Sequence, residues 1–449
     1  MSPAEEGNVG AQEHEKIEQA YGFYDDPALL SYVRTVGAKV TANTERPDVQ
    51  YKVFILDSPI VNAFALPGGY IYVSRGLLAL ANSEAELAAV LAHETGHITA
   101  RHAAERYSHG VVTSLGAAVL SAALKNDAAS QAIGLGGDLY LKSYSRDQEN
   151  EADTLGLRYM TQGGYNPQAM PDFLQSLQQD SALEARLAGG GAGQGFSYFS
   201  THPATADRVA KTRSEAAQYP APGGGGTRES YLSKIQGMVF GDNVHQGLIR
   251  GQTFYHPALG FAFAAPAGFT LINQPEQVVA TGPGGAVMLF DLASAQGTQD
   301  PLQFLAQGWM NNQPLQNLES ITVNGMPAAA AMFDGRVNGR PMVIRLIAIR
   351  WRGDQFARFQ IAIPPQASPA LVDSLKTATY SFHAMTAEDR ARAKPYRLQI
   401  VTAGQGDTSA TLASRQPFQT LSAERFRVLN ALGPQDSVLA GQRYKIVVE

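Results

Sequence analysis

The sequence contains no cysteine among its 449 residues. This absence excludes disulfide bonds, thiolate zinc sites and cysteine nucleophiles, so any metal must be bound by histidine and carboxylate side chains. A tract of lysine and arginine is also missing, and the formal net charge is −5 at pH 7. Such a chain is not typical of proteins that bind nucleic acid or attach to anionic membranes through basic residues.

Long hydrophobic runs are absent as well. The most apolar stretch, Gly110 to Leu124, is about 15 residues long, whereas a membrane-spanning helix needs roughly 20. The first residues, Met-Ser-Pro-Ala-Glu-Glu, have neither the basic region nor the apolar core of a signal peptide. We therefore predict no transmembrane segment and leave two locations open, the cytosol or, with a signal peptide absent from this chain, an exported compartment.

The length and the 44% hydrophobic content predict two to four globular domains. The texture of the sequence divides it into four parts. Residues 1–216 are mostly helical, with a small hairpin or edge sheet expected over Tyr51–Ser74. Residues 217–250 are a Gly/Pro-rich linker and connecting segment. Residues 251–385 have short apolar runs separated by Gly/Pro turns and predict an α+β domain, and residues 386–449 form a small module.

One helical segment carries the pattern His93-Glu94-Thr-Gly-His97. Ser83 and Glu86 predict a capping box at its start, and we expect the helix to continue to His102. The i, i+4 spacing puts His93 and His97 on one face, which suits two ligands of a tetrahedral zinc. Glu94 lies beside such a metal, where it can take a proton from zinc-bound water and pass it to a leaving amine. Gly96 is interpreted as leaving room beside the metal. The alternative to a metal site is that two helical histidines fall four residues apart by chance.

A catalytic zinc needs a third protein ligand and an open fourth position. A second predicted helix contains Glu149 and Asp153, which are four residues apart and share a face. Glu149 can supply the third ligand, and Asp153 can orient a ligand imidazole. Taken by itself, Glu149 on a polar helix would more often be a solvated surface carboxylate, and only the need for a third ligand together with Asp153 favours the metal. His102 is set aside because a continuous helix puts it roughly 140° away from His97, and His109, His245, His256 and His383 have no partner pattern.

Four ordered motifs resemble the HtpX-like gluzincin metallopeptidases, relatives of the CAAX prenyl endopeptidase, and especially their soluble periplasmic branch of β-barrel assembly-enhancing proteases. These motifs are the segment from Asn62 to Leu78, His93–His97, Glu149–Asp153, and Thr201-His202-Pro203 followed by Arg208. The resemblance implies a mostly helical zincin domain with a small sheet, one Zn²⁺ per chain, and Glu149 rather than Glu151 as the third ligand. It also implies that His202 lies at the mouth of the site, where it can occupy the fourth zinc position at rest and act in catalysis, and that Arg208 supports the ligands with Asp153.

Two further expectations concern mobility and substrate. The glycine-rich segment Gly189–Gly195 would let His202 swing away from the metal, although a His-Pro turn that caps a helix near Ala204 is an equal alternative. Asn62 lies in a strand-like segment that could offer backbone groups to an extended substrate. A purely structural turn is the alternative role for Asn62.

The C-terminal parts are less specific. Residues 251–385 resemble small domains of the Mog1/PsbP type in pattern. Residues 386–449 resemble a degenerate LysM module, which would make a cell-wall glycan a possible partner. The fold class predicted for the whole chain is therefore multidomain α+β.

The leading functional prediction is a periplasmic zinc endopeptidase of protein quality control that acts on unfolded or misassembled envelope polypeptides. One alternative is an envelope protein with a binding or chaperone-like role, whose zinc site is kept closed by His202. Another is a zinc hydrolase with a non-peptide substrate.

Overall fold

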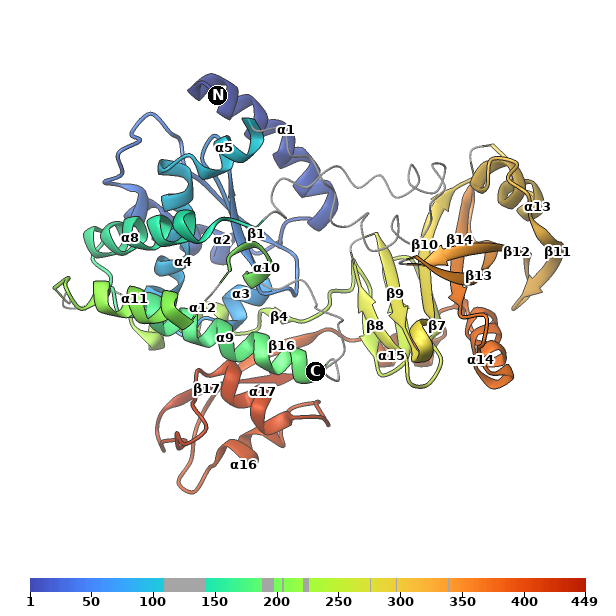
Figure 1. Ribbon diagram of the computed structural model, residues 1–449. Helices are drawn as coiled ribbons and strands as arrows, with labels where there is room; N and C mark the ends of the chain where they lie inside the picture. The colour runs from blue at the N-terminus through green and yellow to red at the C-terminus, as the bar shows by residue number, and fades with distance from the viewer. Residues whose placement is uncertain are drawn as a thin grey trace. The chain divides into compact units, whose positions relative to one another are not determined.

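A computed structural model describes residues 1–108, 143–187, 198–203, 206–220, 226–274, 276–295, 297–337 and 339–449. Contacts divide the chain into two compact units (Figure 1). The first unit contains the described parts of 1–112, 138–241 and 396–449, and the second contains the described part of 242–395. The second unit is thus inserted into the sequence of the first. The four-part division at 216, 250 and 385 stays a prediction.

No helix in the described ranges combines the length and the apolar character needed to span a membrane. Gly110–Leu124, the most apolar stretch, lies outside the described residues, as do residues 221–225 of the predicted linker.

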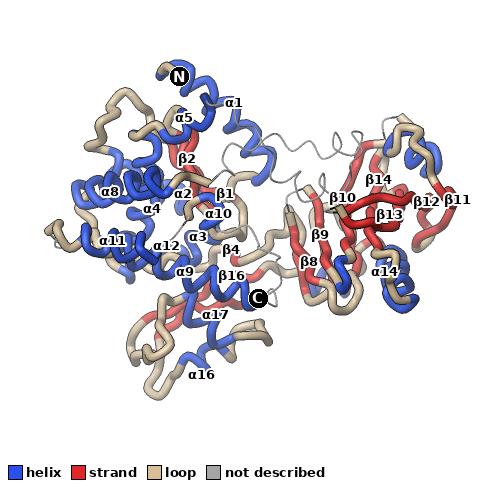
Figure 2. Tube along the Cα trace, viewed as in Figure 1, coloured by secondary structure: helices blue, strands red, loops and turns tan. Residues whose placement is uncertain are grey.

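A three-stranded sheet lies in the first unit (Figure 2). Strands β1 (Lys52–Leu56) and β3 (Tyr70–Ser74) are parallel, and β2 (Ala63–Leu66) pairs antiparallel with β3 at the sheet edge. The turn from β2 to β3 contains Gly68 and Gly69 at φ 79° and 91°, values that favour glycine over residues with a Cβ. The small sheet expected over Tyr51–Ser74 is therefore present, but its two alternating runs, 51–56 and 70–74, pair in parallel, and the hairpin is formed by β2 and β3.

Helices α1 (Pro3–Tyr21), α2 (Pro27–Thr41) and α3 (Arg75–Leu80) precede α4 (Glu84–Thr99), which carries the His-Glu-x-x-His pattern. Every residue of α4 from Leu87 to Ile98 is buried, which explains its many small and apolar side chains. The backbone N–H of Glu86 donates to Ser83 Oγ at 3.2 Å, as a capped helix requires. The predicted capping box is only half right, because the Glu86 carboxylate accepts from the N–H of Asn82 at 2.7 Å rather than from Ser83.

The predicted continuation of this helix to His102 is wrong. Helix α4 ends at Thr99, and Arg101 adopts a left-handed backbone conformation with φ 62°. Nε of Arg101 donates to Oε1 of Glu6 on α1 at 2.6 Å, which holds the turn in place. A new helix, α5 (His102–Ser108), then begins.

Helix α8 (Arg146–Gln162) packs against α4 through two glycines. A Cβ on Gly96 would lie 2.8 Å from the carbonyl oxygen of Ala152, and a Cβ on Gly156 would lie 3.1 Å from the backbone nitrogen of His93. The space beside Gly96 is therefore filled by the backbone of α8 and is not room beside a metal, as the sequence suggested. The unit continues with α9 (Ala169–Leu187), α10 (Tyr198–Thr201), α11 (Ala206–Ala216) and α12 (Arg228–Ile235).

Residues 396–449 complete the first unit. Strands β16 (Tyr396–Thr402) and β17 (Arg443–Val448) are antiparallel, and a short strand β4 (Val239–Phe240) extends their sheet in the order β17-β16-β4. Helices α16 (Ser409–Ala413) and α17 (Ser422–Leu429) lie between them in sequence. The LysM-like assignment of residues 386–449 and the binding of a glycan stay predictions.

Lys445 on β17 ties this segment to the end of α3. Its side chain is fully buried, and Nζ donates to the carbonyl oxygens of Ala79, Leu80 and Ala81 at 2.6, 3.1 and 2.8 Å. These carbonyls lie at the end of α3, where a helix leaves its last acceptors without partners.

The second unit is an antiparallel β structure with helices, which agrees with the α+β prediction for residues 251–385. A seven-stranded sheet has the order β11-β12-β13-β14-β10-β9-β8, and a four-stranded sheet has the order β15-β7-β6-β5. Apolar clusters cover both faces of the larger sheet, one containing Phe263 and Phe359 and the other Phe304 and Phe356. The bounds of the strands are β5 (Leu248–Arg250), β6 (Thr253–His256), β7 (Phe261–Ala264), β8 (Thr270–Asn273), β9 (Gln277–Thr281), β10 (Val287–Ser294), β11 (Gln316–Val323), β12 (Met326–Val337), β13 (Arg340–Arg350), β14 (Gln355–Ile363) and β15 (His383–Ala384). The helices and short turns are η2 (Pro283–Gly285), α13 (Pro301–Gln303), η3 (Phe304–Trp309), α14 (Pro369–Tyr380) and α15 (Ala387–Arg392).

Candidate metal centre

Four side chains that can ligate a metal converge inside the first unit. They are His93 and His97 on α4, Glu149 on α8, and His202, which directly follows α10. All four are buried, and one ligand atom from each lies within 4.8 Å of the others. Among the described residues, this is the one group of three or more such side chains.

The separations between donor atoms fit a tetrahedral metal. Nε2 of His97 lies 3.0 Å from Nε2 of His93 and 3.3 Å from Oε1 of Glu149. Nδ1 of His202 lies 3.3 Å from Nε2 of His93 and 2.9 Å from Oε1 of Glu149. Donors around a tetrahedral zinc with bonds of about 2.0–2.1 Å are separated by roughly 3.3 Å. The spacing and the nitrogen and oxygen chemistry of this group therefore suit Zn²⁺.

Asp153 fixes the orientation of His93. Oδ1 of Asp153 lies 2.9 Å from Nδ1 of His93, so Nδ1 carries the proton and Nε2 turns its lone pair toward the cluster. Burial raises the pKa of Asp153, but the charge and hydrogen bonds of Arg208 and the hydrogen bond from His93 outweigh it. The net effect holds the pKa of this carboxyl well below its usual range, so that Asp153 is ionised.

Arg208 on α11 is a buried cation between two carboxylates. Its Nε and Nη2 donate to Oδ2 and Oδ1 of Asp153 at 2.6 and 2.8 Å, and its Nη1 forms an ion pair with Oε2 of Glu149. Burial raises the pKa of Glu149, but the neighbouring His202 and Arg208 lower it by more, and the net pKa lies well below the usual value.

The formal charges also favour a divalent cation. With the histidines neutral, as metal ligands must be, Glu94, Glu149 and Asp153 contribute three negative charges and Arg208 one positive charge, which leaves −2 in a buried region. An uncompensated buried charge is costly. A Zn²⁺ ion among the four donors would balance it.

Glu94 follows His93 on α4 and is fully buried in the same region. Its Oε1 lies 3.5 Å from Nε2 of His202. The carboxylate is therefore next to the donor cluster without belonging to it, which is the position that a proton-transferring group requires.

His202 lies deeper than the sequence predicted. The resemblance implied a position at the mouth of the site, but the ring is fully buried and stacks on Tyr198 with centroids 4.4 Å apart at 12°. Nε2 has no hydrogen-bond partner among the described residues. The segment Gly189–Gly195, which was expected to let His202 move, lies outside the described residues, and so does Ala204, near which the alternative helix was to start.

Asn62 is held by the backbone at the start of β2. Its N–H donates to Oγ of Ser74 at 3.1 Å, and its carbonyl oxygen accepts from the N–H of Ser74 at 3.0 Å. These bonds fix the turn that leads into the edge strand, while a role in substrate binding stays a prediction.

His102 is the residue that the sequence reasoning missed. Because α4 ends at Thr99, the 140° argument does not apply, and Nδ1 of His102 lies 2.9 Å from Nδ1 of His97. The sequence itself holds no signal for the left-handed Arg101 that produces this contact. His245, His256 and His383 belong to no metal-binding group among the described residues, and His109 lies outside them.

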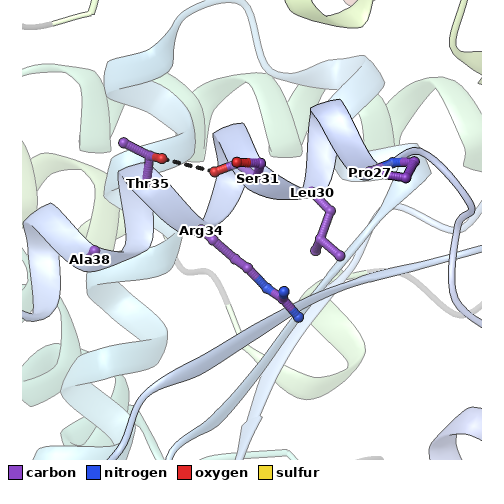
Figure 3. Close-up of a pocket in the computed structure, with 6 residues that line it drawn as sticks. All are labelled: Pro27, Leu30, Ser31, Arg34, Thr35 and Ala38. Atoms are coloured by element: carbon purple, nitrogen blue, oxygen red, sulfur yellow. Dashed lines mark hydrogen bonds between the residues drawn. The ribbon is translucent and has the colours of Figure 1, made fainter.

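A shallow hollow elsewhere in the first unit runs along α2 (Figure 3). All its lining residues come from this one helix, and Thr35 Oγ1 donates to the carbonyl oxygen of Ser31 at 2.9 Å. None of the four metal-ligating side chains lines it, so it offers no chemistry comparable to the cluster.

Comparison with known proteins gives matches in this part of the chain. Residues 27–216 match the model of peptidase family M48. A β-barrel assembly-enhancing protease of Yersinia pestis is 32% identical over 204 residues, which are 43% of this chain and 40% of that protein. The mitochondrial metalloendopeptidase OMA1 of Arabidopsis thaliana is 35% identical over 180 residues, which are 40% of this chain and 34% of that protein. The chain spans about half or less of the length of these curated relatives.

A solved structure of cyanobacterial PsbP from Synechocystis covers 30% of this chain and 92% of its own, with 12% identity and a TM-score of 0.23. A score of this size supports no fold assignment, so the PsbP-like character of residues 251–385 remains a prediction.

Proposed function

Residues 27–216 are a domain of peptidase family M48, and on this premise we propose that the chain is a zinc-dependent endopeptidase. The observation that carries the proposal is the set of four buried donor atoms within 4.8 Å of one another, with Glu94 beside them. Its relatives named as a β-barrel assembly-enhancing protease and a metalloendopeptidase support the same reaction.

In this proposal His93, His97 and Glu149 hold the metal. Zinc bound there would polarise the scissile carbonyl and lower the pKa of the attacking water. Glu94 takes the proton of that water and delivers it to the leaving amine. Asp153 and Arg208 keep His93 and Glu149 oriented, as their hydrogen bonds and ion pair support.

We propose unfolded or misassembled envelope polypeptides as the substrates, and the periplasm as the location. The relatives named for β-barrel assembly support this class. An unfolded chain can be extended beside β2, which is an edge strand next to α4. An edge strand binds an extended peptide through main-chain hydrogen bonds, with the Asn62 turn at its start.

His202 is the fourth ligand of a closed resting state in this proposal. Its burial and the 2.9 Å distance from its Nδ1 to Glu149 support that role. The same contacts support the second candidate, an envelope protein with a binding or chaperone-like role whose zinc site stays closed. Proteolysis separates the two candidates, because only the first predicts cleavage.

The test combines metal analysis with digestion of a denatured protein. We expect one zinc per chain and cleavage of denatured casein that a chelator abolishes. Glu94→Gln should keep its zinc and lose activity by about 10² or more, since the ligands stay and the proton acceptor is removed. Glu15→Gln on the exposed side of α1 is the matched control and should behave as wild type. Wild-type turnover by Glu94→Gln would show that another group activates the water, and absence of zinc from the wild type would overturn the proposal.

A further inference from the structure

Nδ1 of His97, the ring nitrogen that faces away from the donor cluster, contacts a second histidine. Nδ1 of His97 lies 2.9 Å from Nδ1 of His102, whose side chain is 3% exposed. The two rings meet at 69° with centroids 5.1 Å apart. Tyr144 stacks on a face of His97 with centroids 3.7 Å apart, so the His97 ring is held by a stacked face and by its Nδ1.

The direction of the hydrogen bonds follows from the metal chemistry. If Nε2 of His97 gives its lone pair to zinc, the proton of that ring is on Nδ1 and is donated to Nδ1 of His102. The proton of His102 is then on Nε2, which lies 3.3 Å from Oε2 of Glu151. Each donor in this series has one acceptor, and the series ends on a carboxylate whose side chain is 60% exposed.

We propose that His102 is a positioning residue for His97 and that Glu151 selects the tautomer of His102 that can accept from it. This inference rests on the proposed zinc site. Ligand histidines commonly donate their second N–H to an acceptor that fixes ring and tautomer. His93 uses the buried, ionised Asp153 for this purpose, whereas His97 uses a neutral imidazole.

The proposal also accounts for the left-handed Arg101. A continuous helix would carry His102 away from His97, and the reversal at Arg101 brings it back. Glu6 on α1 receives the Arg101 side chain, so the backbone conformation that aims His102 is itself held by a long-range contact.

Two isosteric variants test the acceptor directly. His102→Asn keeps an oxygen where Nδ1 stands, while His102→Leu puts a methyl group there with the same branching. Zinc affinity is measured by competition with a chromophoric chelator, without reference to proteolysis. We expect His102→Leu to bind zinc roughly 10–100-fold more weakly than wild type and His102→Asn to stay within about threefold.

His14→Leu is the control, because Nδ1 of His14 makes a similar 2.7 Å hydrogen bond to Tyr72 outside the cluster. Its zinc affinity should equal that of wild type. Equal affinities of the Leu and Asn variants at position 102 would overturn the positioning role while leaving the zinc site intact. A wild-type chain that binds no zinc would overturn both proposals.

Should His102→Leu fail to fold, Glu151→Ala decides, because it removes the exposed end of the series and leaves the core untouched. We expect zinc binding to weaken by about tenfold, the lower end of what loss of such a partner costs, and an affinity within about threefold of wild type would overturn the proposal.

Discussion

Replacing His202 tests whether the metal centre is closed at rest. If its ring occupies a coordination position at rest, His202→Ala gives that position to water. We expect higher basal proteolysis, including self-cleavage, with zinc retained through His93, His97 and Glu149. Digestion of denatured casein at equal zinc content measures the effect.

The stacked Tyr198 supplies the control for this variant. Tyr198→Phe keeps the ring against His202 and should leave basal activity within about twofold. A fall in the activity of His202→Ala at unchanged zinc content would instead mean that His202 contacts the substrate or the transition state.

At the scale of elements, the contact between α4 and α8 determines whether the ligands meet. A Cβ on Gly96 would be 2.8 Å from the carbonyl oxygen of Ala152, which is backbone and cannot move aside. Gly96→Ala should therefore destabilise the first unit by about 1–3 kcal/mol and weaken zinc binding, since Glu149 and Asp153 move with α8. Thermal unfolding and chelator competition measure the two effects.

Gly7→Ala on α1 is the matched control, because a Cβ there meets nothing within 4 Å. It should raise the free energy of unfolding by about 0.5–1 kcal/mol, as helical glycines replaced by alanine do. Equal behaviour of the two variants would show that the close helix contact does not matter to the site.

The sequence predicted the elements of this site better than their ends. The spacing of His93 and His97 and of Glu149 and Asp153 is local helix geometry, so it could be read from the pattern. Arg101 could not, because its conformation depends on Glu6, which lies on another helix 95 residues earlier. The contact between His102 and His97 could not be predicted for the same reason. The role of Gly96 was also missed, since close helix packing depends on a partner that the local sequence does not reveal.

At the scale of the whole molecule, no pattern in the sequence indicates that residues 396–449 share a unit with α4. In a strand pattern, Lys445 resembles an ordinary surface lysine, yet its Nζ binds three carbonyl oxygens at the end of α3. Burial lowers the pKa of Lys445 well below its ordinary value, and the nearby positive charge of Arg228 adds to this effect, while Glu86 opposes it. Only the tertiary contacts identify this lysine as part of the first unit.

Lys445→Met should therefore destabilise the first unit. The variant loses three hydrogen bonds and leaves their buried acceptors without a donor, but it no longer has to bury an ammonium group. We expect the net loss in the free energy of unfolding to be about 1–3 kcal/mol. Thermal unfolding followed together with zinc release should show a lower midpoint. Lys376→Met, at an exposed position of the second unit, is the control. An unchanged midpoint for Lys445→Met would mean that these three hydrogen bonds do not stabilise the unit.

The insertion of the second unit sets an order of events during synthesis. A ribosome that has reached residue 216 has made all four metal-ligating side chains, but β17, whose Lys445 binds the end of α3, comes more than two hundred residues later. At about 5–20 residues per second, that interval lasts roughly 10–50 s. During that interval the nascent chain carries all four metal-ligating side chains while the carbonyl groups at the end of α3 still lack the Lys445 donor that they meet in the folded unit.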